Sequence, residues 1–200
     1  MAAFTRLEPD ARREEILDAA RRVFVRADFA TTSMGEIADE AGVTRGLLNH
    51  YFGTKRDLYL AVVADVASAL PTMVDTALGD LPVDEMVERN CENFLDAVER
   101  DRELWPVLIG AEALGRDPEV AAVMAAARDE VVERMACNHA DGEPSEELRM
   151  ALRVFQGAAE RAAAEWLGRE RLTREQARAI LTGLLLALVR DVAPSVPRAA

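Results

Sequence analysis

Apolar residues recur at three- and four-residue spacing through most of this 200-residue chain, in segments that open at capping residues and close at glycine or proline. That spacing puts the apolar side chains on one face of an α-helix. The chain is also rich in Ala, Leu, Glu and Arg, which favour helices over strands. We therefore predict an all-α protein of about nine helices. The predicted helices are residues 9–27, 33–41, 45–52, 55–77, 84–99, 101–114, 117–136, 145–167 and 174–192. Proline should kink or interrupt the fourth helix, at Pro71, and disturb the sixth, at Pro106.

Two short helices near the N-terminus are joined by a tight turn. Thr32 or Ser33 can cap the first of them, and Glu36 completes a capping box if Ser33 is the cap. Gly42 ends this helix in a left-handed conformation, which costs a glycine little. Thr44 caps the second helix, which lasts about two turns. This order of elements is the helix-turn-helix pattern.

The second short helix has an apolar underside and a polar outer face. Leu48 and Phe52 are four residues apart and point the same way, with Val43 just outside the cap on that side. The outer face suits the major groove, where arginine bonds to guanine, asparagine bonds to adenine and an aliphatic group packs on the thymine methyl. A helix pair of this kind can also be a plain packing unit with a solvated surface. The outer-face residues are Thr44, Arg45, Gly46, Leu47, Asn49 and His50.

Charge is distributed unevenly along the chain. Residues 1–58 hold 9 basic and 10 acidic residues, whereas the rest of the chain has a net charge of -11. An acidic body repels DNA phosphates, so any contact with nucleic acid is expected from the N-terminal quarter. Lys55, the only lysine, and the backbone N–H groups from Thr54 onward are expected to hold a phosphate at the start of a helix. Thr32 and Ser33 are expected to do the same on the other flank.

The segment TTSMGEIADEAGVTRGLLNHYFGTKRDLYLAV, residues 31–62, resembles the DNA-binding segment of the TetR family of bacterial transcriptional regulators. The resemblance covers about residues 10–63. It implies a homodimer whose two recognition helices enter successive major grooves of a pseudo-palindromic operator in double-stranded DNA. The family's DNA-facing places correspond to Thr44, Arg45, Gly46, Leu47, Asn49, His50, Tyr51 and Lys55.

Two residues depart from the family's habit. Asn49 stands where an aromatic residue, usually tyrosine, is common, so a base-edge contact can replace a phosphate or stacking contact. Leu47 replaces a small or hydroxylated residue. The operator sequence therefore cannot be taken from relatives.

The resemblance also implies two domains, with residues 1–54 binding DNA and residues 55–200 forming a helical ligand-binding and dimerisation domain. We expect a cytoplasmic repressor that a small apolar or amphipathic effector releases from DNA. The alternative is a helical small-molecule-binding or enzymatic protein whose helix-turn-helix is vestigial.

The last two predicted helices are apolar on broad faces. In the family the corresponding helices form a four-helix bundle with their symmetry mates, and the alternative is that they are internal core. The expected interface residues are Leu152, Phe155, Ala159, Ala162, Leu181, Leu184, Leu185 and Leu188.

Effector-contacting residues are harder to identify, because each apolar candidate can equally be core. Trp105 beside Pro106 is the first choice, since a helix disturbed by proline leaves free carbonyl groups and a gap. The other candidates are Phe94, Leu108 and Met124, with Trp166 and Met86 less favoured.

Other kinds of chemistry find no support in the sequence. No catalytic constellation or glycine-rich phosphate loop is present, so we expect neither an enzyme nor a cofactor. Cys91 and Cys137 lack metal-ligand spacing and are expected to be buried free thiols. His139, in a polar loop with Asp141 and Glu143, is expected at the surface and not as a metal ligand. No signal peptide is expected, because the N-terminal residues contain no apolar h-region. The longest nearly uncharged apolar run, residues 179–189, is expected to be too short to span a bilayer.

Overall fold

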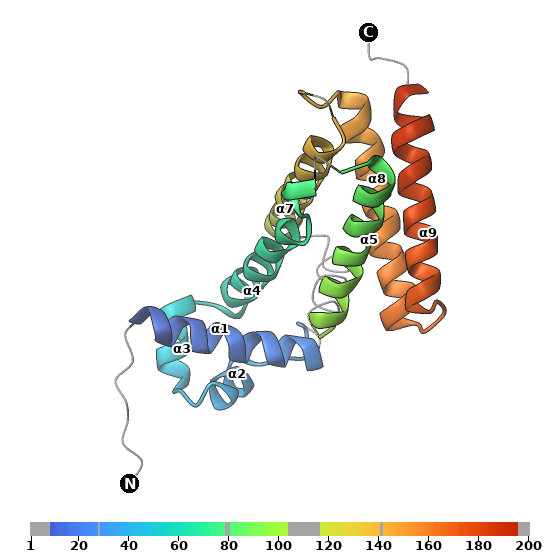
Figure 1. Ribbon diagram of the computed structural model, residues 1–200. Helices are drawn as coiled ribbons and strands as arrows, with labels where there is room; N and C mark the ends of the chain where they lie inside the picture. The colour runs from blue at the N-terminus through green and yellow to red at the C-terminus, as the bar shows by residue number, and fades with distance from the viewer. Residues whose placement is uncertain (1–8, 28, 79–80, 104–116, 141, 196–200) are drawn as a thin grey trace. The chain divides into compact units, whose positions relative to one another are not determined.

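The computed structural model describes residues 9–27, 29–78, 81–103, 117–140 and 142–195. Within these residues it contains eight α-helices and no strand, which confirms the all-α fold (Figure 1). The helices are α1 (Pro9–Arg26), α2 (Met34–Glu40), α3 (Arg45–Phe52), α4 (Lys55–Ala69), α5 (Val83–Arg100), α7 (Pro118–Asn138), α8 (Glu146–Ala163) and α9 (Arg174–Ala187). The predicted helix over residues 101–114 falls mostly outside the described residues.

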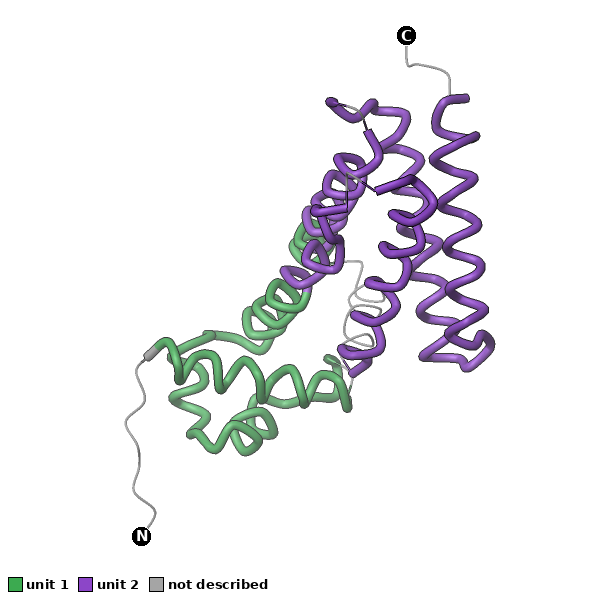
Figure 2. The backbone as a smooth tube through the Cα atoms, viewed as in Figure 1, with its two compact units in different colours: residues 1–66, 106–123 green, residues 67–105, 124–200 purple. Residues whose placement is uncertain are grey.

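The chain divides into two compact units, drawn in separate colours in Figure 2. The described part of the first unit consists of residues 9–66, without residue 28, and residues 117–123. Its core combines one apolar face from each of α1, α2 and α3 with the first turns of α4. The fully buried side chains Ile16, Ile37, Leu48 and Leu58 come from these four helices in turn. The rings of Phe24 and Tyr59 meet edge to face, with their centroids 5.1 Å apart.

The predicted helix over residues 55–77 is interrupted, as expected from Pro71. The α-helix ends at Ala69, and Pro71 lies in a 3₁₀ turn, Leu70–Met73, that is followed by a second short turn, Thr76–Leu78. Proline cannot donate the hydrogen bond that an α-helix needs at that position.

Lys55–Leu78 is long and apolar enough to cross a membrane by length and composition, but 44% of its most apolar window is buried in the fold. Leu58, Val62 and Val63 lie in the core, so a core helix explains the composition.

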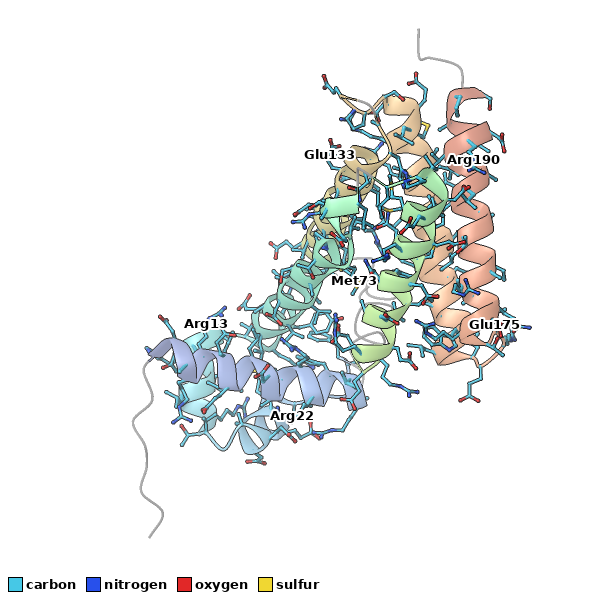
Figure 3. All side chains as sticks on the ribbon, viewed as in Figure 1. Arg13, Arg22, Met73, Glu133, Glu175 and Arg190 are labelled. Atoms are coloured by element: carbon cyan, nitrogen blue, oxygen red, sulfur yellow. The ribbon has the colours of Figure 1, made fainter. Side chains whose placement is uncertain are left out.

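The second unit is built around a core that α5, α7, α8 and α9 share. α9 packs against both α5 and α8, and the three helices run side by side in Figure 1. Arg174, at the start of α9, pairs with Glu92 of α5 at 2.8 Å. Arg149 of α8 pairs with Glu133 of α7 at 2.7 Å, where Figure 3 labels Glu133. The buried core residues are Val87, Cys91, Leu95, Val132, Met135, Ala136, Leu148, Ala151, Leu152, Phe155, Ala159, Ala162, Ala177, Leu181, Leu185, Leu188 and Ala193.

The structure corrects the expected dimer interface, because seven of its eight residues are buried in this core. Only Leu184 is exposed, with 46% of its surface accessible. Both helices carry apolar residues around more than half of their circumference, so the pattern does not separate the face toward the core from the face toward solvent. The seven core residues are Leu152, Phe155, Ala159, Ala162, Leu181, Leu185 and Leu188.

Two smaller expectations were also wrong in part. Cys91 is buried as expected, and burial raises the pKa of its thiol to about 11, whereas Cys137 is exposed. His139 is partly buried, both of its ring nitrogens are covered, and burial lowers the pKa of its imidazole. The polar composition of the loop did not reveal that this ring turns inward.

Candidate nucleic-acid interface

Side-chain caps set where α2 and α3 begin. Ser33, not Thr32, caps α2: its hydroxyl accepts from the Glu36 N–H at 3.2 Å, and the Glu36 carboxylate accepts from the Ser33 N–H at 2.7 Å. These hydrogen bonds to Ser33 hold the pKa of Glu36 below its usual range. Gly42 adopts a positive φ of 64° in the turn, and the Thr44 hydroxyl accepts from the Leu47 N–H at 3.2 Å. The predicted helix-turn-helix geometry is therefore fixed by local hydrogen bonds.

Burial separates the two faces of α3 as the sequence predicts. Leu48 and Phe52 are buried under the helix, whereas Val43 is only partly buried. The predicted outer-face residues, from Thr44 to Leu47 together with Asn49 and His50, are all exposed, and Tyr51 is partly buried. The rings of His50 and Tyr51 contact each other with their centroids 5.7 Å apart. The outer face of α3 is thus an exposed, mostly polar surface that includes the apolar Leu47, and the buried Leu48 and Phe52 anchor the helix to the core.

Arg45 differs from most arginines in the described part of the chain, because no ion pair ties it to a carboxylate. Arg22 and Arg26 both pair with Glu40, at 2.9 and 2.6 Å. Arg56 pairs with Asp117 at 2.8 Å. The guanidinium of Arg45 therefore remains available to a ligand outside the fold, while its neighbours are neutralised within it.

Gly46 is not required by the packing of the free protein. A Cβ built at this position meets only the Thr44 hydroxyl, at an ordinary contact distance of 3.9 Å. Glycine inside a helix is less stable than alanine by about 0.5–1 kcal/mol. Its presence is explained if another surface must approach the helix closely at this point.

Replacing Gly46 with alanine is expected to separate stability from binding. The free energy of unfolding should rise by about 0.5 kcal/mol, because alanine favours the helix, whereas DNA affinity should fall at least several-fold, because the methyl group keeps the helix away from the duplex. Urea unfolding and fluorescence anisotropy with labelled DNA measure the two effects. Gly35→Ala in α2 is a suitable control, since a Cβ there meets only the Ser33 hydroxyl, at 3.7 Å. Equal DNA affinities of wild type and Gly46→Ala would contradict the close approach.

Thr32 and Lys55 do not present the open phosphate-binding groups that the sequence suggested. Thr32 is buried, with its hydroxyl 3.5 Å from the Ala27 carbonyl oxygen, which overturns its expected role on the flank of α2. The Lys55 ammonium donates to the carbonyl oxygens of Phe29 and Thr32, both at 2.8 Å, and lies 4.5 Å from the centre of the Phe29 ring. Lys55 therefore ties the loop between α1 and α2 to the start of α4. Sequence spacing could not show this contact, because it joins residues more than twenty positions apart.

The salt dependence of DNA binding shows whether Lys55 contacts a phosphate or only stabilises the fold. Replacement by methionine should lower the free energy of unfolding by about 1–3 kcal/mol, because two charge-assisted hydrogen bonds are lost. The slope of log K against log salt for DNA binding should change little. A direct phosphate contact predicts instead that the slope becomes shallower by about 0.9 for each Lys55, or about 1.8 for the dimer, with unchanged stability, and that result would restore the original assignment. Lys55→Arg keeps the charge and is the control.

The expected effector residues are only partly placed. Met86 and Met124 are buried, and Phe94 and Trp166 are partly buried against the core of the second unit. Trp105 and Leu108 lie outside the described residues. Within the described part of the chain, no group of three or more His, Cys, Asp or Glu side chains is arranged to hold a metal ion.

The fold and the capped α2–turn–α3 unit define a helix-turn-helix protein. Residues 16–62 match the family model described as bacterial regulatory proteins, tetR family, and residues 83–188 match that of the tetracyclin repressor-like C-terminal domain. The second match alone covers more than half of the chain, and the protein belongs to the TetR family. This is a family of transcriptional regulators and not of enzymes, in agreement with the sequence analysis.

Individual relatives match over part of their length. The chain is 34% identical over 125 residues to the transcriptional activator FasR of Mycolicibacterium smegmatis, covering 58% of this chain and 53% of FasR. It is 33% identical over 127 residues to the repressor LfrR of the same organism, covering 60% of this chain and 61% of LfrR. The chain thus spans less than two-thirds of these relatives. A TetR-family regulator from Streptomyces coelicolor shares the fold, with a TM-score of 0.77 at 23% identity over 96% of this chain and 92% of that one.

Proposed function

We propose that this protein is a DNA-binding transcriptional regulator that recognises a pseudo-palindromic operator as a homodimer. The observation that carries the proposal is the outer face of α3, where Arg45, which forms no ion pair with the described residues, stands beside the exposed Asn49 and His50. Arginine and asparagine are the side chains best suited to bidentate contacts with guanine and adenine in the major groove. The net charge of -12 makes non-specific attraction of the whole chain to DNA a poor alternative.

An exposed apolar stripe on α8 and α9 supports the homodimer. Met150 and Val154 are 54% and 70% exposed on α8, and Ile180 and Leu184 are 44% and 46% exposed on α9. These two pairs, each four residues apart, form what we call the α8/α9 stripe. Gly157 and Gly183 add no bulk beside it, since a Cβ at either position would meet no atom within 4 Å. A second copy of the chain fits this surface, because a two-fold operator requires an isologous protein interface.

Release by a small effector and repression of the target genes complete the proposal. LfrR and AcnR of Corynebacterium glutamicum are named repressors, and FasR is a named activator. EbrR, a multidrug-binding protein solved with imidazole, shares the fold with a TM-score of 0.68 at 23% identity. The dimer has one form whose recognition helices fit successive major grooves and another whose helices do not. An effector that binds the second form more tightly weakens operator binding, by an amount set by its difference in affinity for the two forms. Such a protein works in the cytoplasm, where the DNA is.

Selection of bound fragments from sheared genomic DNA tests the proposal. Wild type should enrich fragments that share a two-fold symmetric site with half-sites about one helical turn apart. The Arg45→Ala variant should not enrich them. If wild type enriches no symmetric site, the helix-turn-helix does not read DNA, and the chain is better regarded as a helical ligand-binding protein.

A further inference from the structure

Helix α5 is buried on two separate faces. Val87, Cys91 and Leu95 belong to the core that α5 shares with α8 and α9. Met86, Asn90 and Ala97 are also buried, although they are not part of that core cluster. Their spacing of four and seven residues puts them on one stripe of the helix. This second face, which we call the Asn90 face, therefore points into a different part of the interior.

Asn90 is the polar member of the Asn90 face, and its carboxamide lacks partners. The side chain is 7% exposed, and both Nδ2 and Oδ1 are covered without a hydrogen-bond partner in the part of the chain that the structure describes. Buried amide groups in native proteins are almost always paired, because leaving them unpaired costs free energy. Asn90 therefore indicates a hydrogen-bond partner from outside the described residues.

A second buried asparagine in the same unit shows the ordinary arrangement. Asn138, at the end of α7, is 6% exposed and donates from Nδ2 to the carbonyl oxygen of Asp75 at 2.7 Å. Asn138 thus joins two segments of the fold, whereas Asn90 joins none of the described ones. The two residues have the same chemistry and burial and differ in their hydrogen bonding.

The surroundings of Asn90 on α5 specify the chemistry of the missing partner. Its neighbours one turn away on α5 are Met86 and Val87 before it and Asn93 and Phe94 after it, three apolar residues and one carboxamide, and none of them is charged. An ionic group placed there would need a compensating charge. The carboxamide itself offers a donor and an acceptor side by side.

We propose that Asn90 is the polar recognition group of the effector site, and that the effector is an uncharged amphipathic molecule. Its head carries an acceptor and a donor side by side, as a primary amide or a lactam does, and its body is apolar. This inference rests on the proposed function, in which an effector binds the larger unit.

Stability in the absence of any ligand is the first test. Asn90→Leu removes an unpaired polar group and should raise the melting temperature by about 2–4 °C. Asn138→Leu removes a paired group and should lower it by a similar amount or more. If Asn90→Leu is as destabilising as Asn138→Leu, the carboxamide is a structural group and the inference is overturned.

Binding of defined probes is the second test. Straight-chain primary amides of six to twelve carbons are compared with the carboxylates and alkylammonium ions of equal length, by thermal shift at pH 7.5. The amides should raise the melting temperature of wild type and of Asn138→Leu, but not that of Asn90→Leu. Equal shifts from the charged probes, an amide shift that survives in Asn90→Leu, or no shift from any probe would each overturn the inference. Operator selection by the same preparation reports on the proposed function separately, so either can fail alone.

Discussion

Replacing Arg45 with alanine is expected to weaken operator binding by about 1–3 kcal/mol, or roughly 5- to 150-fold, while the free energy of unfolding stays the same. The affinity falls because a bidentate contact to guanine is lost. Stability is unaffected because Arg45 is exposed and has no ion pair with the described residues. Discrimination against a changed base should relax at one symmetric pair of positions and not elsewhere. Anisotropy titrations with operators substituted at each position in turn measure both effects.

Arg100→Ala is the matched control for this substitution. Arg100 lies in the second unit, its side chain is 69% exposed, and its ion pair is with the adjacent Asp101. Removing it changes the net charge by the same amount but leaves α3 intact. Equal losses of affinity in the two variants would mean that Arg45 contributes only general charge, and the base-reading assignment would fail.

Introducing a charge at Leu184 is expected to separate the dimer. Leu184→Glu puts a carboxylate in the α8/α9 stripe, where a desolvated charge without a partner is strongly unfavourable in a dimer interface. The dissociation constant of the dimer should rise by at least 100-fold, and operator affinity should fall with it, because each monomer contacts only one half-site. Analytical ultracentrifugation and operator titration measure the two quantities.

Two comparisons make the result at Leu184 specific. Val83→Glu on α5 also replaces an exposed apolar residue, 37% accessible, with a charge, yet it lies outside the stripe and should leave the dimer intact. Leu181→Ala, at a fully buried position on α9, should instead destabilise the fold by about 2–5 kcal/mol. A Leu184→Glu protein that remains dimeric at wild-type affinity would show that the stripe is not the interface.

The parts of the fold set by local interactions were predictable from the sequence. Ser33 with Glu36 forms the expected capping box, and Thr44 caps α3 as predicted. Thr173 with Gln176 forms a second capping box of the same spacing at the start of α9. Each cap joins residues three positions apart, so the spacing of residue types is sufficient to find it. The two faces of α3 follow from the same periodicity.

Features that depend on distant segments were not predictable in the same way. The broad apolar surfaces of α8 and α9 do not reveal which side of each helix faces the core, so the sequence predicts an interface role for core residues such as Leu152 and Leu185. The bonds from Lys55 to Phe29 and Thr32 depend on how the loop after α1 folds back. The sequence does not show that Asn90 lacks a hydrogen-bond partner among the described residues, because this depends on which groups the fold brings near its carboxamide.

We expect the distribution of ion pairs to confine DNA contacts of this acidic chain to α3. Arginines of α1 and α4 are neutralised by Glu40 and Asp117, and hydrogen bonds from the arginines hold the pKa values of these carboxyl groups low. The carboxylates therefore stay ionised, and these ion pairs persist, at neutral pH. Arg45, in contrast, forms no ion pair with a carboxylate in the described part of the chain. We expect specificity to depend on α3 far more than on overall charge.

Methylation interference on the selected operator tests the central claim most directly. Methylating guanine N7 blocks a bidentate arginine contact without breaking the duplex. Wild type should lose binding when N7 is methylated at one guanine in each of two symmetric half-sites, about one helical turn apart, and Arg45→Ala should be insensitive at those guanines. Interference that is absent, confined to one half-site, or unchanged in Arg45→Ala would contradict recognition of DNA by the outer face of α3 in a symmetric dimer.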